Sequence, residues 1–147
     1  MTDTKVFARL IDAVNRKDVD GAAGCYSRDV HYAEPGINCE LHGRDQVHEL
    51  YKSWMTNADL TARLDDAFSA GDRGAFVFTM TGTVVNEVAG MWNADAVGRT
   101  FSVAIAVIAR LDADGLMSEA VYYWDVMTML SQLGQIQGRP ESGGEAA

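Results

Sequence analysis

The sequence predicts an α+β fold in which an antiparallel sheet packs one face against helices from the first part of the chain. Two observations indicate this class. Apolar residues recur with a period of about 3.6 in two segments before Leu60, and from Leu60 onward the period changes to two. Residues that tolerate tight turns separate the later segments, as in "AGDRG" and "DADG". Helices followed by a meandering sheet define an α+β domain, and strong curvature would make that sheet a cone.

Helical patterns dominate the first third of the chain. A first helix is expected within residues 2–18, and a shorter helical piece begins at Asp18. The stretch "YSRDVHYAEPG", residues 26–36, predicts a short strand that ends at a Pro-Gly turn. The helix within residues 43–58 has the sharpest amphipathic pattern, with apolar side chains at Val47, Leu50, Tyr51, Trp54 and Met55.

Strands are expected in the second half, followed by a closing helix. Alternating patterns place the strands at about residues 60–69, 75–88, 99–111 and 116–124. The final helix follows in "DVMTMLSQLG" and stops at Gly134. One domain is therefore expected over residues 1–134, and the tail 135–147 is expected to be disordered.

Composition and charge exclude several classes of function. The chain has 147 residues, 48% of them hydrophobic, and a formal net charge of −9, which would repel a nucleic-acid backbone. Its longest apolar run, "FSVAIAVIA", falls short of the roughly 20 residues that a membrane helix needs. The amino terminus lacks a secretory pattern and Cys25 and Cys39 form no CxxC pair, so we expect a cytoplasmic protein without disulfides.

The strands expected at 75–88 and 99–111 carry more apolar side chains than a thin sheet needs. These side chains could line a ligand pocket, or they could simply pack against the helices. The residues concerned are Phe76, Phe78, Met80, Phe101, Val103, Ile105 and Val107.

Three motifs resemble those of a known superfamily. They are "NRKDVDGAAGCYSRDVHYAEPG" at Asn15–Gly36, "GRTF" at Gly98–Phe101 and "YYWDVMTMLSQLG" at Tyr122–Gly134. Over about residues 4–134 the chain resembles the nuclear-transport-factor-2-like superfamily, which includes ketosteroid isomerases and SnoaL-like polyketide cyclases. The resemblance implies a cone-shaped sheet with a pocket for a hydrophobic small molecule. It also implies a homodimer, to which the sheet's outer face, with Thr79, Thr81 and Thr83, would contribute.

The first motif supplies a candidate catalytic acid. In ketosteroid isomerases a catalytic Asp precedes a Pro at the end of this strand, and Glu34 precedes Pro35 here. Burial at the wide end of an apolar cone would raise the pKa of Glu34 and make it a stronger base. Tyr32 shares its strand face and is expected to accompany it, whereas His31 points to the other face. Alternatively, Glu34 lies exposed beside the turn.

The third motif supplies a second candidate, Asp125. The resemblance to polyketide cyclases implies that Asp125 acts as acid or base, and in that case Tyr123, on the same strand face, would line the cavity too. Alternatively, Asp125 caps the following helix. Two acids in different environments would supply one proton acceptor and one donor.

The chain departs from both families in its other polar groups. The oxyanion-binding Tyr and Asp of ketosteroid isomerases correspond to Leu10 and Val107, and Ala33 stands near the place of a His that polyketide cyclases often carry. Substitute donors could be Tyr32 or Tyr123, which we rank first, Tyr51, or the indole of Trp92. Met91 and Trp92 could also gate the pocket or form a dimer contact. The predicted substrate-binding residues are Tyr32, Tyr51, Trp54, Met91, Trp92, Phe101 and Tyr123.

Metal and nucleotide sites are not expected. His31, His42 and His48 follow no metal-ligand spacing, and the chain has neither a phosphate-binding loop nor a dinucleotide fingerprint. The sequence therefore predicts chemistry without a metal or a cofactor.

These observations favour a cofactor-free acid/base enzyme acting on a hydrophobic, carbonyl-bearing molecule. The expected reaction is an intramolecular aldol-type cyclisation or a proton shift, as in a polyketide cyclase or isomerase of natural-product biosynthesis. A second hypothesis is an epoxide hydrolase or cyclase in which Asp65 or Asp66 joins Glu34. A third is a non-catalytic module for ligand binding or dimerisation.

Overall fold

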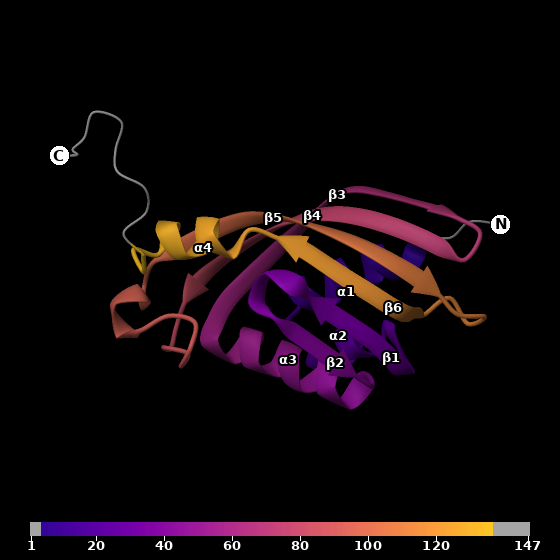
Figure 1. Cartoon of the computed structure of the whole chain (residues 1–147), viewed down its shortest axis with the longest axis horizontal. Coiled ribbons are helices and arrows are strands. Elements are labelled where there is room, and N and C mark those ends of the chain that lie inside the picture. Colours follow the sequence, from indigo (N-terminus) through magenta and orange to yellow (C-terminus); the bar gives the residue numbers. More distant parts are fainter. Residues whose placement is uncertain (1–3, 137–147) are drawn as a thin grey trace.

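A six-stranded curved sheet, open at both edges, forms the body of the molecule, and α1, α2 and α3 cover one of its faces (Figure 1). The computed structural model describes residues 4–136, so most of the predicted tail, 137–147, lies outside the described residues. The helices and strands are α1 (Lys5–Asn15), α2 (Val19–Ala23), β1 (Tyr26–Glu34), β2 (Cys39–His42), α3 (Arg44–Asn57), β3 (Ala58–Ala70), β4 (Arg73–Val84), β5 (Thr100–Leu111), β6 (Met117–Trp124) and α4 (Val126–Gln132), with short 3₁₀ turns η1 (Pro35–Ile37) and η2 (Ala94–Ala96). The predicted α+β class and curved sheet are confirmed.

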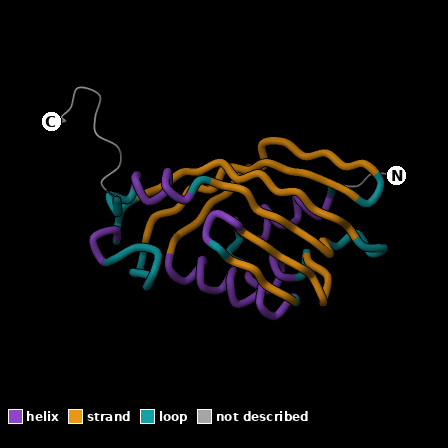
Figure 2. Tube along the Cα trace, viewed as in Figure 1, coloured by secondary structure: helices purple, strands orange, loops and turns teal. Residues whose placement is uncertain are grey.

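The strand order is β2-β1-β6-β5-β4-β3, and Figure 2 shows the loops gathered at the two ends of the strands. Neighbouring strands are antiparallel except β1 and β6, which run parallel with Tyr32 opposite Ala120. Neighbouring parallel strands have their C-terminal ends on the same side of a sheet. The last residues of β1 and β6, Glu34 and Trp124, therefore lie close together although 90 positions separate them.

The predicted elements are present, with two differences. The sequence patterns did not predict β2, a strand of four residues that pairs with the end of β1. The strand expected at 75–88 ends at Val84, and residues 85–99 form a loop in which Val88 bridges Trp92. No helix among residues 4–136 is long and apolar enough to cross a membrane.

The core lies between the concave face of the sheet and the three N-terminal helices. Phe7 of α1 stacks on Phe76 of β4 with ring centroids 4.4 Å apart. A Cβ on Gly82 would lie 2.6 Å from the ring of Phe101, so this position admits the ring because it has no side chain. Leu10 and Val107, the positions that correspond to the oxyanion donors of ketosteroid isomerases, are fully buried in this apolar core.

Candidate active site

The concave face of the sheet and α3 enclose a cavity of about 50 Å³. Most of its lining is apolar or aromatic, and within residues 4–136 Glu34 is the one acid that reaches it. The lining residues are Tyr32, Glu34, Leu50, Tyr51, Trp54, Leu60, Phe78, Met80, Phe101, Val103, Ile105, Tyr122, Trp124 and Met129. Most of the apolar residues predicted to line a pocket on β4 and β5 do line it. Phe76 and Val107 do not, and they belong only to the packed core.

Glu34 is the last residue of β1, and only 5% of its surface is exposed. Alternation along the strand turns Val30, Tyr32 and Glu34 inward and leaves His31 outside. The Tyr32 hydroxyl donates to Oε2 of Glu34, and Nε1 of Trp124 donates to Oε1 at 2.8 Å. Burial raises the pKa of Glu34 above its ordinary value of 4.5, and these two hydrogen bonds oppose that rise only in part.

Three further tyrosines form a buried cluster beside this carboxyl. The Tyr26 hydroxyl lies 2.7 Å from that of Tyr51 and in hydrogen-bond contact with that of Tyr122, and the Tyr51 and Tyr122 hydroxyls are 3.2 Å apart. Burial raises the pKa of all three phenols, so they are protonated at neutral pH and can donate. Tyr51 and Tyr122 line the cavity, whereas Tyr26 contacts their hydroxyls without lining it.

Asp125 does not enter the cavity, and the predicted convergence of two acids is wrong. It is exposed and caps α4, since its Oδ1 accepts from the backbone of Met127 at 3.0 Å and of Thr128 at 3.3 Å. Its Oδ2 accepts from the Thr128 hydroxyl at 2.8 Å. These bonds, led by that of the Thr128 hydroxyl, hold the pKa of Asp125 below its ordinary value of 3.8. The alternative role, helix capping, is the one that the contacts show.

The other predicted site residues divide between the cavity and its surroundings. Tyr32, Tyr51, Trp54 and Phe101 line the cavity. Tyr123 does not, because it is 52% exposed on the outer face of β6. The last two, Met91 and Trp92, line an adjoining depression of about 170 Å³.

Leu50 and Trp54 of α3 stand between the cavity and this depression, because both spaces include them in their lining. The Trp54 ring packs edge-on against Trp92 and Trp124, at centroid distances of 5.7 and 6.2 Å. The Trp92 indole donates to the carbonyl of Asn86 at 2.8 Å, so it is already paired and is not a spare donor for a ligand.

The sequence interpretation missed Tyr26, Tyr122 and Trp124. It placed Tyr123 and Asp125 on the inner face of β6, but the inner face carries Ala120, Tyr122 and Trp124. The consecutive aromatics Tyr122, Tyr123 and Trp124 leave the phase of the alternation ambiguous. The available signal was Glu119, a charged residue that favours the solvent face and shares its strand face with Tyr123.

The acids proposed for epoxide chemistry also lie elsewhere. Asp65 is exposed and accepts hydrogen bonds from the Thr79 hydroxyl at 2.6 Å and from Arg63 at 2.7 Å. Asp66 is exposed as well. Neither residue joins Glu34 in the cavity.

The family assignment agrees with this architecture. A profile of the SnoaL-like domain matches residues 7–120. The chain belongs to the SnoaL-like domain family, within the nuclear-transport-factor-2-like superfamily. No curated protein sequence matches it.

Solved structures share the fold at low sequence identity. IdmH, a putative polyketide cyclase from Streptomyces antibioticus, superposes with a TM-score of 0.73 at 24% identity, over 89% of this chain and 97% of that one. AclR, a putative hydroxylase from Streptomyces galilaeus, gives 0.76 at 22% identity, over 93% and 87%. An LEH-like epoxide hydrolase from M. tuberculosis gives 0.69 at 14% identity, over 89% and 88%. These likenesses support the SnoaL-like fold but not a particular reaction.

Proposed function

We propose that this protein is a cofactor-free acid/base enzyme that moves a proton on a small, hydrophobic, carbonyl-bearing molecule. The observation that carries the proposal is the position of Glu34, a carboxyl in an apolar cavity with two hydrogen-bond donors fixed to it. Burial, which raises the pKa of Glu34, brings that pKa closer to neutral pH and strengthens the carboxylate as a base. A positioned base of this kind contributes about 10²- to 10⁴-fold to a reaction rate.

The proposed reaction begins when the Glu34 carboxylate removes a proton from the carbon next to the substrate carbonyl. The electron pair of that C–H bond moves onto the carbonyl oxygen, which becomes an enolate. Tyr51 and Tyr122, two cavity-lining residues whose hydroxyls lie 3.2 Å apart, would donate to that oxygen. Their donation would replace the oxyanion pair whose positions Leu10 and Val107 occupy in this chain.

One carboxyl is enough to complete the reaction. Where the substrate has a C=C bond next to the deprotonated carbon, the enolate extends over it as a dienolate, and protonated Glu34 returns its proton to the far carbon of that bond, which gives a proton shift. In the cyclisation, the enolate carbon attacks a second carbonyl of the same molecule, and the resulting alkoxide takes the proton from Glu34. Either outcome restores the carboxylate without net consumption of acid, so the absence of Asp125 from the cavity does not break the cycle.

Entry of a substrate requires α3 side chains to move. The cavity of about 50 Å³ is far smaller than the roughly 300–1,000 Å³ typical of small-molecule sites. Leu50 and Trp54 separate it from the adjoining depression of about 170 Å³, and both are only partly buried. Displacement of the Trp54 ring would join the two spaces, so we infer that the substrate enters past Met91 and Trp92.

The proposal is tested by proton exchange rather than by the unknown natural substrate. Small hydrophobic ketones are incubated with the protein in D₂O, and loss of the signal of the proton next to the carbonyl is followed by NMR. Glu34→Gln should lower the exchange rate about 10²- to 10⁴-fold. It should leave ketone binding, measured by quenching of tryptophan fluorescence, in place. A wild-type protein that binds ketones without exchanging their protons would indicate a ligand-binding module instead.

Epoxide opening is distinguished by a parallel assay for the hydrolysis of small hydrophobic epoxides. With Asp65 and Asp66 outside the cavity, water attack on an epoxide would have to use Glu34 with a tyrosine as the acid. Epoxide hydrolysis by a protein that exchanges no ketone protons would replace the proposed reaction with this one.

We also propose a homodimer, as the family resemblance implies. Thr81 and Thr83 of β4 lie on the outer face of the sheet and pair with Ser102 and Thr100 of β5 at 3.2 and 3.1 Å. A molar mass of one chain, about 16.0 kDa by light scattering, would contradict the dimer.

A further inference from the structure

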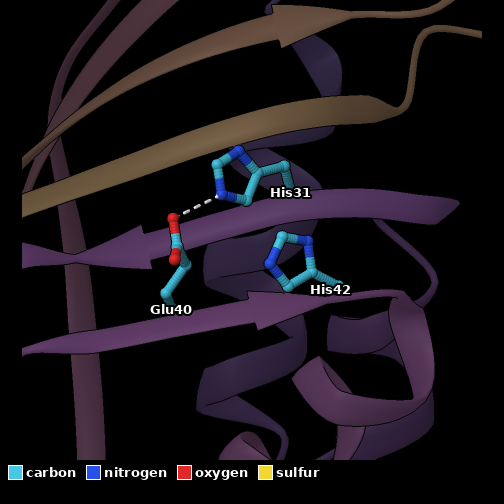
Figure 3. A group of neighbouring side chains, drawn as sticks. All are labelled: His31, Glu40 and His42. Atoms are coloured by element: carbon cyan, nitrogen blue, oxygen red, sulfur yellow. Dashed lines mark hydrogen bonds and ion pairs between the residues drawn. The ribbon is translucent and has the colours of Figure 1, made fainter.

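The outer face of the hairpin β1–β2 brings together three potential metal ligands, His31, Glu40 and His42 (Figure 3). His31 lies directly opposite His42 in the antiparallel ladder, and Glu40 precedes His42 by two positions. Residues two apart on a strand share a face, and opposite residues on neighbouring strands have Cβ atoms about 4.5–5.5 Å apart. The three side chains therefore project from the same side of the sheet, away from the cavity.

The distances within this cluster suit a single ion. One ligand atom from each residue can be chosen so that all lie within 4.8 Å of one another, and Nε2 of His31 is 2.9 Å from Oε2 of Glu40. The ligand atoms of a tetrahedral zinc ion, with bonds of about 2.0–2.1 Å, lie about 3.3 Å apart. Side-chain rotations alone would close the difference.

The two imidazoles are free to make those rotations. Their rings are stacked with centroids 4.8 Å apart and an interplanar angle of 7°. The lone pair of a ring nitrogen lies in the plane of its ring, so both rings must turn to aim at one ion. Both histidines are exposed, and β2 is an edge strand with β1 as its one neighbour, so no further strand of the sheet lies beside His42.

We infer that His31, Glu40 and His42 bind a divalent transition-metal ion of the Zn²⁺ type, with water completing its coordination. Imidazole nitrogens favour such ions over Mg²⁺ and Ca²⁺, which prefer oxygen ligands. Three protein ligands leave a fourth tetrahedral position open. The formal net charge of −9 attracts cations, and Glu119, which lies opposite His31 on β6, adds negative charge, although Arg110 lies 3.8 Å from its carboxylate.

The site would be coupled to the strand that carries Glu34. An ion bound to both strands would tie β2 to β1, and the same ladder ends with Glu34 opposite Cys39. An ion that binds the folded hairpin stabilises it in proportion to the logarithm of ion concentration over Kd. Zn²⁺ should therefore raise the Tm of the protein.

Isothermal titration of untagged protein with Zn²⁺ tests this inference. The chain has three histidines, and the third, His48, provides a matched control. It also contacts carboxylates, Asp20 at 2.8 Å and Glu49 at 3.7 Å, but has no second imidazole beside it. Wild type and His48→Ala should bind one equivalent of Zn²⁺ with equal affinity.

The cluster variants should lose that binding. Removing a residue that merely supports a metal ligand weakens affinity about 10- to 100-fold, so His31→Ala and His42→Ala should each lose at least about tenfold. Both should also lose the rise in Tm on adding Zn²⁺, while their metal-free circular dichroism matches that of wild type. Affinity unchanged in the two variants, loss of binding in His48→Ala, or no saturable binding to wild type would each overturn the inference.

Discussion

Glu34 and Asp125 lie at the same end of two neighbouring parallel strands, Glu34 as the last residue of β1 and Asp125 just after β6, yet their surroundings are opposite. Glu34 turns inward, is almost fully buried, and has a pKa raised by burial. Asp125 turns outward, caps a helix, and has a pKa lowered by its hydrogen bonds. The difference is one of strand alternation, because a shift of one residue exchanges the faces of a sheet. The burial of each carboxyl, and with it the direction of its pKa shift, therefore depends on the face of the sheet toward which its side chain points.

The sharpest test of this comparison changes two neighbouring tyrosines of β6. Tyr122→Phe removes the hydroxyl of a cavity-lining side chain, whereas Tyr123→Phe removes a hydroxyl from the outer face. Loss of one donor to a developing oxyanion costs about 10²- to 10³-fold in kcat. Ketone proton exchange should fall by that order for Tyr122→Phe and stay at the wild-type rate for Tyr123→Phe. Equal effects of the two substitutions would contradict the assignment of faces.

A smaller effect is expected where Trp124 holds Glu34. Trp124→Phe removes a hydrogen bond that lowers the pKa of Glu34, so that pKa should rise further. The base acts when deprotonated, and activity is lost as the pH falls through its pKa. The acidic limb of the pH–rate profile should therefore move to higher pH, by up to about one to two units.

Trp92→Phe is the control for that shift, because the Trp92 indole donates to the carbonyl of Asn86 and not to a carboxylate. Its profile should keep the wild-type limb. A Trp124→Phe profile that moves to lower pH, or does not move, would show that the indole does not act on Glu34.

The smallest effect concerns the outer carboxyl. Asp125 has a folded-state pKa below its ordinary value, so its ionised form stabilises the fold above about pH 3.8 and that contribution is lost as the pH falls through the folded-state pKa. Asp125→Ala should lower Tm at neutral pH, and the difference from wild type should shrink in acid. Asp125→Asn, which keeps a capping oxygen, should retain most of the Tm. Both should exchange ketone protons at the wild-type rate.

The change of folding stability with pH has the opposite sign for Glu34. Its folded-state pKa is raised, so the contribution to stability that it makes when protonated is lost as the pH rises from its ordinary value of 4.5 through the folded-state pKa. Thermal unfolding of wild type and Glu34→Gln across that range should show wild type losing stability relative to the variant. The opposite trend would mean that the buried carboxyl is held ionised.

Local patterns in the sequence were enough for the fold class and for the strand face that Tyr32 and Glu34 share, whereas the inward position of Glu34 was predicted only with the family resemblance. Periods of 3.6 and two identify helices and strands, and alternation from Val30 through Tyr32 gives the inner face of β1. The motif resemblance identified the family, which the domain match confirms.

The missing parts depend on pairings that no local pattern encodes. Glu34 meets Trp124 because β1 and β6 run parallel, a contact between segments 90 positions apart. His31 meets His42 because of β2, whose four residues are too few to show a period. Once β2 is known, strand alternation places Glu40 and His42 on the same face, beside His31.

The most direct test of the central claim is the titration of individual side-chain carboxyls by carbon-13 NMR, with Glu34→Gln and Asp125→Asn used to assign the two signals. The account predicts a pKa above 4.5 for Glu34 and a pKa below 3.8 for Asp125 in the same protein. A Glu34 signal that titrates at or below 4.5 would contradict it, because the carboxyl would then be solvated or held as a permanent anion.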